Sequence, residues 1–220
     1  MSQLSSMPYD LIICMPGTGD NEGFDVARTI KGQYEHIPMV ILTPFSHGIT
    51  KRIANEDLSS FDYIFCWLGN TDLLVSIIKL IEDKMNLEHD VSEVGVQIIL
   101  LVEDGIRFYS SILPNLYKFV LKQSQEFSTE ALNAHQRTLR MRGRPKIVLA
   151  RTYNEAIGIY EKYKNNILGV ITDVRFPRVE RGEKDALAGI KLCAAIRKED
   201  PFVPLIIQSS ESENVSYAAK

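Results

Sequence analysis

Cysteine is scarce in this chain, and its three copies lie far apart. Cys14, Cys66 and Cys193 form no CxxC pair, the close spacing that is typical of many zinc sites. The four histidines show no ligand-like spacing either. The sequence therefore predicts neither a zinc site nor a disulfide framework.

Long apolar runs and an excess of positive charge are also absent. No apolar stretch reaches the roughly 20 residues of a membrane-spanning helix, and Met1–Pro8 has no hydrophobic signal core. The formal net charge of −3 argues against nucleic-acid binding through bulk electrostatics. With 45% hydrophobic and 24% charged residues, the composition indicates a soluble globular protein, and we expect a cytoplasmic location with no membrane partner.

Short apolar runs rich in β-branched residues are present, and two of them end in acidic residues. Ile167–Thr172 is followed by Asp173, and Leu100–Val102 is followed by Glu103 and Asp104. Such runs are typical of buried parallel strands, and open α/β sheets bind ligands at the carboxyl ends of their strands. If the two strands are neighbours, three carboxylates meet at one edge. Because their mutual repulsion must be relieved, we expect a divalent cation there.

The order and spacing of these features resemble the receiver domain of two-component response regulators. In that family an acidic pair follows strand 1, a phosphoacceptor Asp follows strand 3 with a proline four residues later, and a Ser or Thr follows strand 4. Asp173, Pro177 and Ser209 hold the last three positions here. The resemblance spans about Val96 to the C-terminus. It implies an α/β, flavodoxin-like (CheY-like) fold with helices on both faces of a parallel sheet.

The resemblance also implies a chemistry. Asp173 would take a phosphoryl group from a histidine kinase or phosphotransfer protein, and Ser209 with Ser210 would bind that group. Mg²⁺ would be the cofactor, and its expected ligands are Glu103, Asp104, Asp173 and the backbone carbonyl oxygen of Arg175. The alternative is purely local, because acids are favoured at helix N-termini and would there cap the loop and the helix that follow them.

A weaker copy of the pattern precedes this region. Gly23–Thr43 aligns with Gly189–Ser209 without a gap over 21 residues, at a constant offset of 166 (189 minus 23). An internal repeat of this kind indicates two related units.

The first copy has no acid at the position of Asp173. Ile12–Cys14 align with Val170–Thr172, which leaves Met15 nearest to that position, whereas Thr43 keeps the hydroxyl that follows strand 4. The resemblance therefore implies a degenerate pseudo-receiver with no phosphoacceptor, which would serve interaction or regulation.

Both copies are incomplete against the receiver pattern. We expect a partial pseudo-receiver over 1–89 (strand 3 to helix 5), a linker over 90–95, and a receiver over 96–220 that stops before strand 5 and the lysine it carries. This organisation predicts a piece of a longer polypeptide. A less favoured alternative lets Tyr63–Trp67 complete the second sheet, within the chain or across a dimer.

Apolar spacing and capping residues predict the remaining elements. Strands are expected at 9–14, 38–43, 63–67, 96–102, 147–150, 167–172 and 204–208. Helices are expected at 23–34, 49–55, 106–123, 128–142, 152–164 and 189–197, with another that starts after Asn70 or Thr71.

Two segments are longer than an ordinary receiver requires. The stretch 105–146 has about twice the length of one crossover connection. We expect its basic residues on a solvated helix face and linker rather than in a phosphate-binding patch, and they are Arg137, Arg140, Arg142, Arg144 and Lys146. The loop 178–188 overhangs the expected site and either gates it or is simply tolerated at the surface.

The favoured function is a phosphoacceptor module of a two-component phosphorelay, which regulates an attached or partner output and is not otherwise an enzyme. An interaction scaffold that is never phosphorylated remains open. So does a regulatory segment of a phosphoenolpyruvate synthase or pyruvate phosphate dikinase-type polypeptide, which the stretches at 9–16, 51–59 and 108–119 resemble. A Mg²⁺-dependent phosphohydrolase is less favoured because Arg175 replaces the second Asp of its DxD motif. The output partner and a homodimer are left open.

Overall fold

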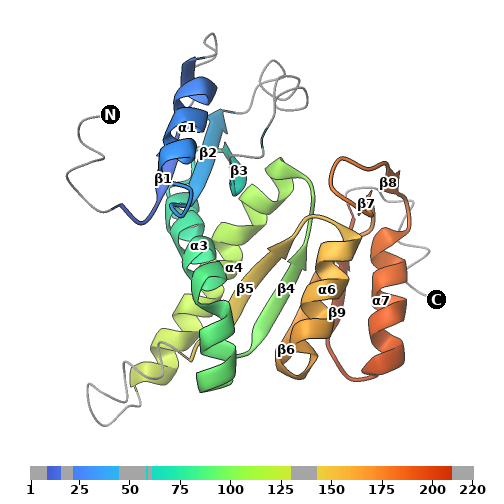
Figure 1. Ribbon diagram of the computed structural model, residues 1–220. Helices are drawn as coiled ribbons and strands as arrows, with labels where there is room; N and C mark the ends of the chain where they lie inside the picture. The colour runs from blue at the N-terminus through green and yellow to red at the C-terminus, as the bar shows by residue number, and fades with distance from the viewer. Residues whose placement is uncertain (1–8, 16–21, 45–57, 59–60, 130–142, 210–220) are drawn as a thin grey trace. The chain divides into compact units, whose positions relative to one another are not determined.

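The computed structural model describes residues 9–15, 22–44, 58, 61–129 and 143–209 (Figure 1). The chain divides into two compact units, one of 1–78 with 106–114 and the other of 79–105 with 115–220. Helices α3 (Asp72–His89) and α4 (Ile106–Thr129) each contribute residues to both units. The compact units therefore do not follow one another along the chain.

The first unit is built on a three-stranded parallel sheet in the order β1-β2-β3. Its strands are β1 (Ile12–Cys14), β2 (Met39–Pro44) and β3 (Tyr63–Trp67). Helix α1 (Glu22–Gln33) buries Phe24, Ala27 and Ile30 against strand residues such as Met39 and Ile41. This i, i+3, i+6 spacing is the apolar stripe that the sequence pattern predicts for a helix on one sheet face.

The second unit contains a four-stranded parallel sheet in the order β5-β4-β6-β9. Its strands are β4 (Ile98–Val102), β5 (Lys146–Ala150), β6 (Ile167–Asp173) and β9 (Leu205–Gln208). Numbered along the chain, this order is 2-1-3-4, as in flavodoxin-like folds. The expected α/β class with parallel sheets is confirmed, and the second unit is consistent with the flavodoxin-like topology.

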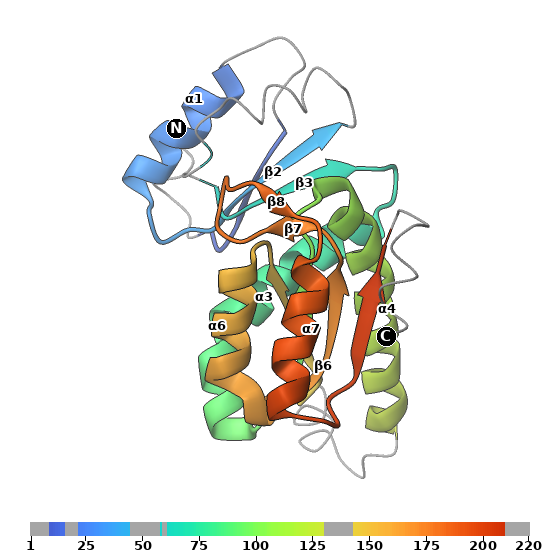
Figure 2. The same ribbon diagram turned by 90° about the vertical axis from the view of Figure 1, so that its right-hand side faces the viewer.

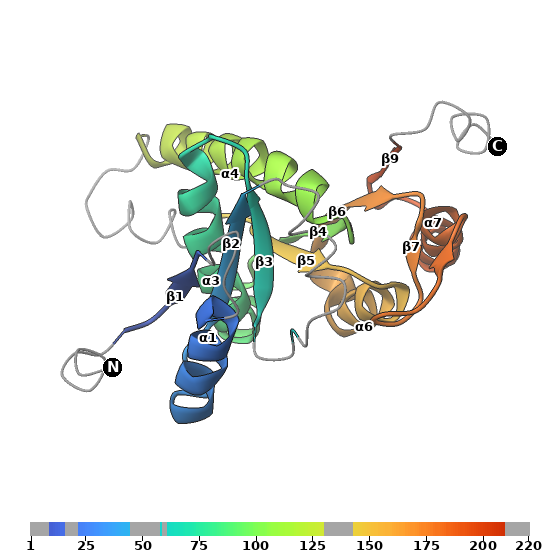
Figure 3. The same ribbon diagram turned by 90° about the horizontal axis from the view of Figure 1, so that it is seen from above.

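Helices lie on both faces of this second sheet (Figure 3). On one face are α6 (Tyr153–Tyr163) and α7 (Ala188–Glu199), whose buried side chains share a core with β4, β5 and β6. Thr152 caps α6 by accepting a hydrogen bond from the Glu155 N–H at 3.2 Å. A single 3₁₀ turn, Lys164–Asn166, then leads into β6.

The repeat found in the sequence recurs in the structure. The bounds of α1 and α7 differ by 166 residues at both ends, and β2 and β9 also begin 166 residues apart. The pairing registers match as well, because Ile12 faces Met39 and Val170 faces Leu205. The N–H groups of Ile12 and Val170 even donate to equivalent proline carbonyls, at 3.0 and 2.9 Å. Each unit thus contains the same strand-helix-strand segment.

Several elements differ from the sequence-based expectation. The segment 90–95, predicted as a linker, is a π-helical turn (Asp90–Val94) that ends at Gly95, where φ is 70°. Helix α4 ends at Thr129, later than the predicted end at 123. The loop 178–188 contains a very short strand, β8 (Lys184–Asp185), which pairs with β7 (Phe176–Pro177) just before the loop to form a hairpin (Figure 2). The predicted helices 49–55 and 128–142 fall outside the described residues, apart from 128–129, which belong to α4.

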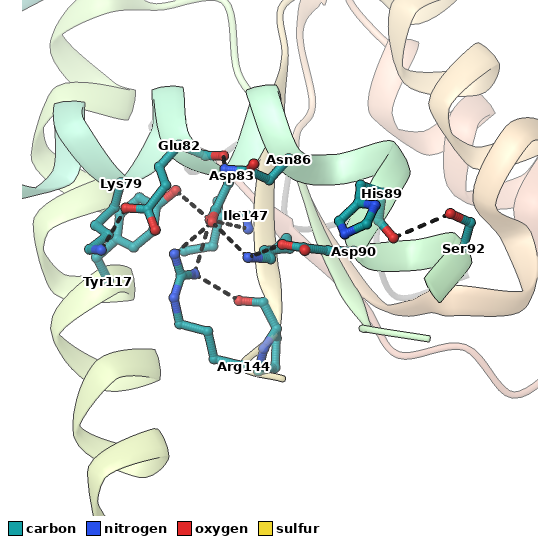
Figure 4. A network of polar contacts seen from close by, with 12 residues as sticks. Lys79, Glu82, Asp83, Asn86, His89, Asp90, Ser92, Tyr117, Arg144 and Ile147 are labelled. Carbon is teal, nitrogen blue, oxygen red and sulfur yellow. Dashed lines mark hydrogen bonds and ion pairs between the residues drawn. The ribbon is translucent and has the colours of Figure 1, made fainter. Parts of the chain in front are cut away.

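A buried ion-pair network joins α3, α4 and β5 in the second unit (Figure 4). The Asp83 carboxylate is fully buried and accepts from both terminal nitrogens of Arg144, at 2.6 and 3.1 Å. It also accepts from the Tyr117 hydroxyl at 2.9 Å and the Ile147 N–H at 3.0 Å. Lys146 is buried beside it and pairs with Asp90 at 2.6 Å. The expectation that Arg144 and Lys146 lie on a solvated face is therefore wrong, because Asp83 and Asp90 neutralise them.

Candidate functional site

The candidate site lies at the carboxyl ends of β4 and β6. These strands pair in parallel with Val102 opposite Thr172, so the residues that follow both positions lie at one sheet edge. Glu103 and Asp104 come directly after β4, and Asp173 ends β6. One oxygen of each carboxylate lies within 4.8 Å of the others. The structure thus brings together the three acids that the sequence singled out.

Two of these acids also make local hydrogen bonds. Glu103 Oε1 accepts from the Gly105 N–H at 2.8 Å, and Asp173 Oδ2 accepts from the Arg175 N–H at 3.3 Å. The local capping interpretation therefore describes part of what they do. It does not account for Asp104, whose Oδ1 is buried and has no hydrogen-bond partner among the described residues. A buried carboxylate oxygen without a partner is unusual and calls for a ligand.

Burial and mutual repulsion disfavour the ionised form of the carboxyl groups in this cluster. Burial raises the pKa of Glu103 to about 7, and the nearby Asp173 and Asp104 add to this rise against the Gly105 N–H and Lys184. The pKa of Asp173 is also raised, first by burial and then by Asp104. A cation bound among the three carboxylates would remove this penalty.

A lysine that the sequence did not single out reaches the cluster. Lys184 lies on β8, and its Nζ is 2.6 Å from Asp104 Oδ2. The antiparallel pairing of Pro177 with Lys184 returns the chain to the site after the 178–183 turn. The only sequence signal for this part of the site was the unusual length of the 178–188 loop. Strands of two residues are too short to show a recognisable pattern.

The other expected site residues occupy the same sheet edge or its connections. Asp173 pairs with Gln208, so Ser209 follows at the carboxyl end of β9. Arg175 is exposed in the turn between β6 and β7, and Pro177 is buried within β7. Ser210 lies outside the described residues.

The first unit lacks a comparable cluster within its described residues. Cys14 pairs with Ile41 as Thr172 pairs with Ile207, so Met15 occupies the register position of Asp173. Met15 is largely exposed. The Thr43 hydroxyl is buried and donates to the Phe65 carbonyl oxygen at 3.3 Å. The chemistry available in the second unit is therefore not repeated here.

The second-unit cluster fits a hard divalent cation. Mg²⁺ prefers carboxylate oxygens and keeps part of its water shell, so one or two carboxylates satisfy it. Glu103, Asp104 and Asp173 would hold it, and the unpartnered Asp104 Oδ1 is the most direct structural reason to expect a ligand.

Comparisons with known proteins do not identify a family. No family model matches the chain, and no curated protein or solved structure matches it significantly. In the part of the chain that the structure describes, no helix combines the length and the apolar character needed to cross a membrane.

Proposed function

We propose that the second unit is a phosphoacceptor receiver module of a two-component phosphorelay. One observation carries this proposal: Glu103, Asp104 and Asp173 converge at the carboxyl edge of a parallel sheet whose strand order is 2-1-3-4. This is the edge at which open α/β sheets bind ligands. The module would work in the cytoplasm with a histidine kinase or phosphotransfer protein as its donor.

Asp173 is the nucleophile in this proposal. One of its carboxylate oxygens attacks the phosphorus of a phosphohistidine, a P–O bond forms, and the electrons of the broken P–N bond return to the imidazole. The Arg175 N–H holds Asp173 Oδ2 at 3.3 Å and so orients the carboxylate. Ser209, at the end of β9, would donate a hydrogen bond to the transferred group.

Charge neutralisation is the main catalytic requirement of such a transfer. Mg²⁺, when bound, would supply positive charge against the phosphoryl oxygens. Glu103 and Asp104 contribute by holding negative charge at a buried edge where a cation is favoured. Burial, and then the charge of Asp104, raise the pKa of Asp173 in the cation-free chain, and a bound cation would favour its ionised form.

The first unit would then be a pseudo-receiver with an interaction or regulatory role. Its strand-helix-strand segment repeats that of the second unit, but Met15 stands where Asp173 stands. The output that the pair controls is a separate polypeptide or an attached domain, and an enzyme of the phosphoenolpyruvate synthase type is one option.

Metal titration and a phosphoryl donor test this proposal together. Calorimetry should show Mg²⁺ or Mn²⁺ binding that Asp104→Ala abolishes. With Mg²⁺ and phosphoramidate or acetyl phosphate, mass spectrometry should show one added phosphoryl group on Asp173 and none in Asp173→Asn. If a correctly folded chain binds no metal and stays unmodified, the interaction scaffold is the better description.

A further inference from the structure

We propose that Lys184, on the β7–β8 hairpin, is the basic residue of the Asp173 site and binds the transferred phosphoryl group. This inference rests on the proposed phosphoacceptor function and adds a specific residue to it. It also assigns a purpose to the long loop 178–188, which would deliver that residue to the sheet edge.

Contact with the acidic cluster is the first reason. Lys184 Nζ lies 2.6 Å from Asp104 Oδ2, and its positive charge also acts on Glu103 and Asp173. The lysine side chain is 46% exposed, whereas that of Asp104 is only 15% exposed. The ammonium therefore stands where the buried carboxylates meet solvent, which is also where an incoming phosphoryl group must arrive.

Contacts at several points of the β7–β8 hairpin fix the position of Lys184. Phe176 at its start is fully buried in the core of the second unit. At its turn, the Arg178 carbonyl oxygen accepts from the Asn154 N–H of α6 at 3.1 Å. At its end, Asp185 pairs with Lys191 of α7 at 2.5 Å. Because neighbouring strand residues point to opposite sides, this pairing leaves Lys184 directed away from Lys191 and towards the acids.

Unused hydrogen-bonding capacity is the second reason. An ammonium group has three N–H donors, and among the described residues the Lys184 ammonium pairs with one carboxylate oxygen, Asp104 Oδ2. The remaining donors can bind a phosphoryl oxygen while the ion pair persists. Lysine is a compact point charge that commonly binds phosphate groups in this way.

A simple counter-ion role would give a different result, and this difference makes the proposal testable. If Lys184 only neutralises Asp104, its removal should strengthen cation binding and leave phosphoryl binding unchanged or stronger. If it binds the phosphoryl group, its removal should strengthen Mg²⁺ binding but weaken the binding of a phosphoryl analogue. The two affinities then move in opposite directions.

The experiment compares the full chain with Lys184→Met and Lys184→Arg. Calorimetry measures Mg²⁺ alone, and ¹⁹F NMR measures beryllofluoride, an acyl-phosphate mimic, in saturating Mg²⁺. For Lys184→Met we expect about threefold tighter Mg²⁺ binding, as for loss of a partly exposed ion pair, and about tenfold weaker beryllofluoride binding. Lys184→Arg should recover much of the beryllofluoride affinity because it keeps the charge.

Lys198→Met is the matched control, since Lys198 is an exposed lysine on α7 away from the hairpin. It should leave both affinities unchanged. Equal beryllofluoride binding by the wild-type chain and Lys184→Met would overturn the role of Lys184 alone. No beryllofluoride binding by the wild-type chain in Mg²⁺ would overturn the phosphoacceptor function, and the Lys184 proposal with it.

Discussion

Glu103 connects the electrostatics of the candidate site to the stability of the chain. Its pKa is about 7 in the folded state, against 4.5 for an unperturbed glutamate. Between these pH values the unfolded chain releases a proton that the folded chain keeps. The free energy of unfolding therefore falls as pH rises from about 4.5 to about 7, and the loss is complete above pH 7.

The first prediction is that Glu103→Gln removes this loss. In the presence of a chelator, the variant should be more stable than the wild-type chain by about 3 kcal/mol at pH 8, and the difference should vanish near pH 4. The amide oxygen can still accept the Gly105 N–H. Urea unfolding across this pH range measures the effect, and parallel stability curves for the two chains would contradict it.

The second prediction concerns the buried Asp83 carboxylate. Asp83→Ala leaves Arg144 buried without its charge partner, so we expect a loss of about 3–5 kcal/mol in the free energy of unfolding. Adding Arg144→Met should recover part of this loss. Glu88→Gln is the control, because its ion pair with Lys162 is exposed and should leave the free energy of unfolding nearly unchanged. If Asp83→Ala lowered the free energy of unfolding as little as the control does, water would have to enter the network and solvate Arg144.

The sequence predicted some of these residues and not others, for a physical reason. The sequence could predict three site residues, Glu103, Asp104 and Asp173, because an acid directly after a buried apolar run is a local pattern. The partnership of Asp83 with Arg144 spans 61 residues and depends on how α3 meets β5. Lys184 depends on a hairpin whose strands have two residues each. Neither contact leaves a local signature.

At the level of elements, the first turn of helix α7 packs closely against the backbone of Asp173. The Gly189 N–H donates to the Val174 carbonyl oxygen at 3.0 Å, and a Cβ built on Gly189 would lie 2.0 Å from the Asp173 carbonyl oxygen. No side chain fits that space. The glycine therefore allows the helix to approach the strand end that carries the proposed nucleophile.

The third prediction follows from this close approach. Gly189→Ala should push α7 away from β6, lower the free energy of unfolding by about 2–3 kcal/mol and weaken Mg²⁺ binding. Gly158→Ala in α6 is the matched control, because nothing lies within 4 Å of its added methyl group. That change should be neutral or stabilise the helix by up to about 1 kcal/mol. Calorimetric titration and urea unfolding of both variants test the contrast.

The repeated strand-helix-strand segment was the most predictable part of the fold. Its helix stripe, glycine and strand recur in the sequence at one offset, and α1 and α7 have matching bounds. The ends of the long helices were less predictable. The sequence predicted helix 106–123, but α4 continues to Thr129.

For the whole molecule, the fourth prediction is that Mg²⁺ raises thermal stability through the acidic cluster. A ligand that binds only the folded state stabilises it by about 2.7 kcal/mol at one hundred times its Kd. The Tm of the wild-type chain should therefore rise with Mg²⁺ concentration, and that of Asp104→Ala should not. Scanning calorimetry measures both. A similar rise in the variant would indicate binding elsewhere.

The division of the chain into interleaved units has a consequence for dissecting the protein. The boundary between the units is crossed three times, at 78–79, 105–106 and 114–115, so no single cut releases either one intact. A fragment of 96–220, the receiver range that the sequence predicts, omits helix α3 and with it Asp83, the charge partner of Arg144. Such a fragment should be insoluble or molten when expressed alone, and supplying 1–95 in trans should rescue it.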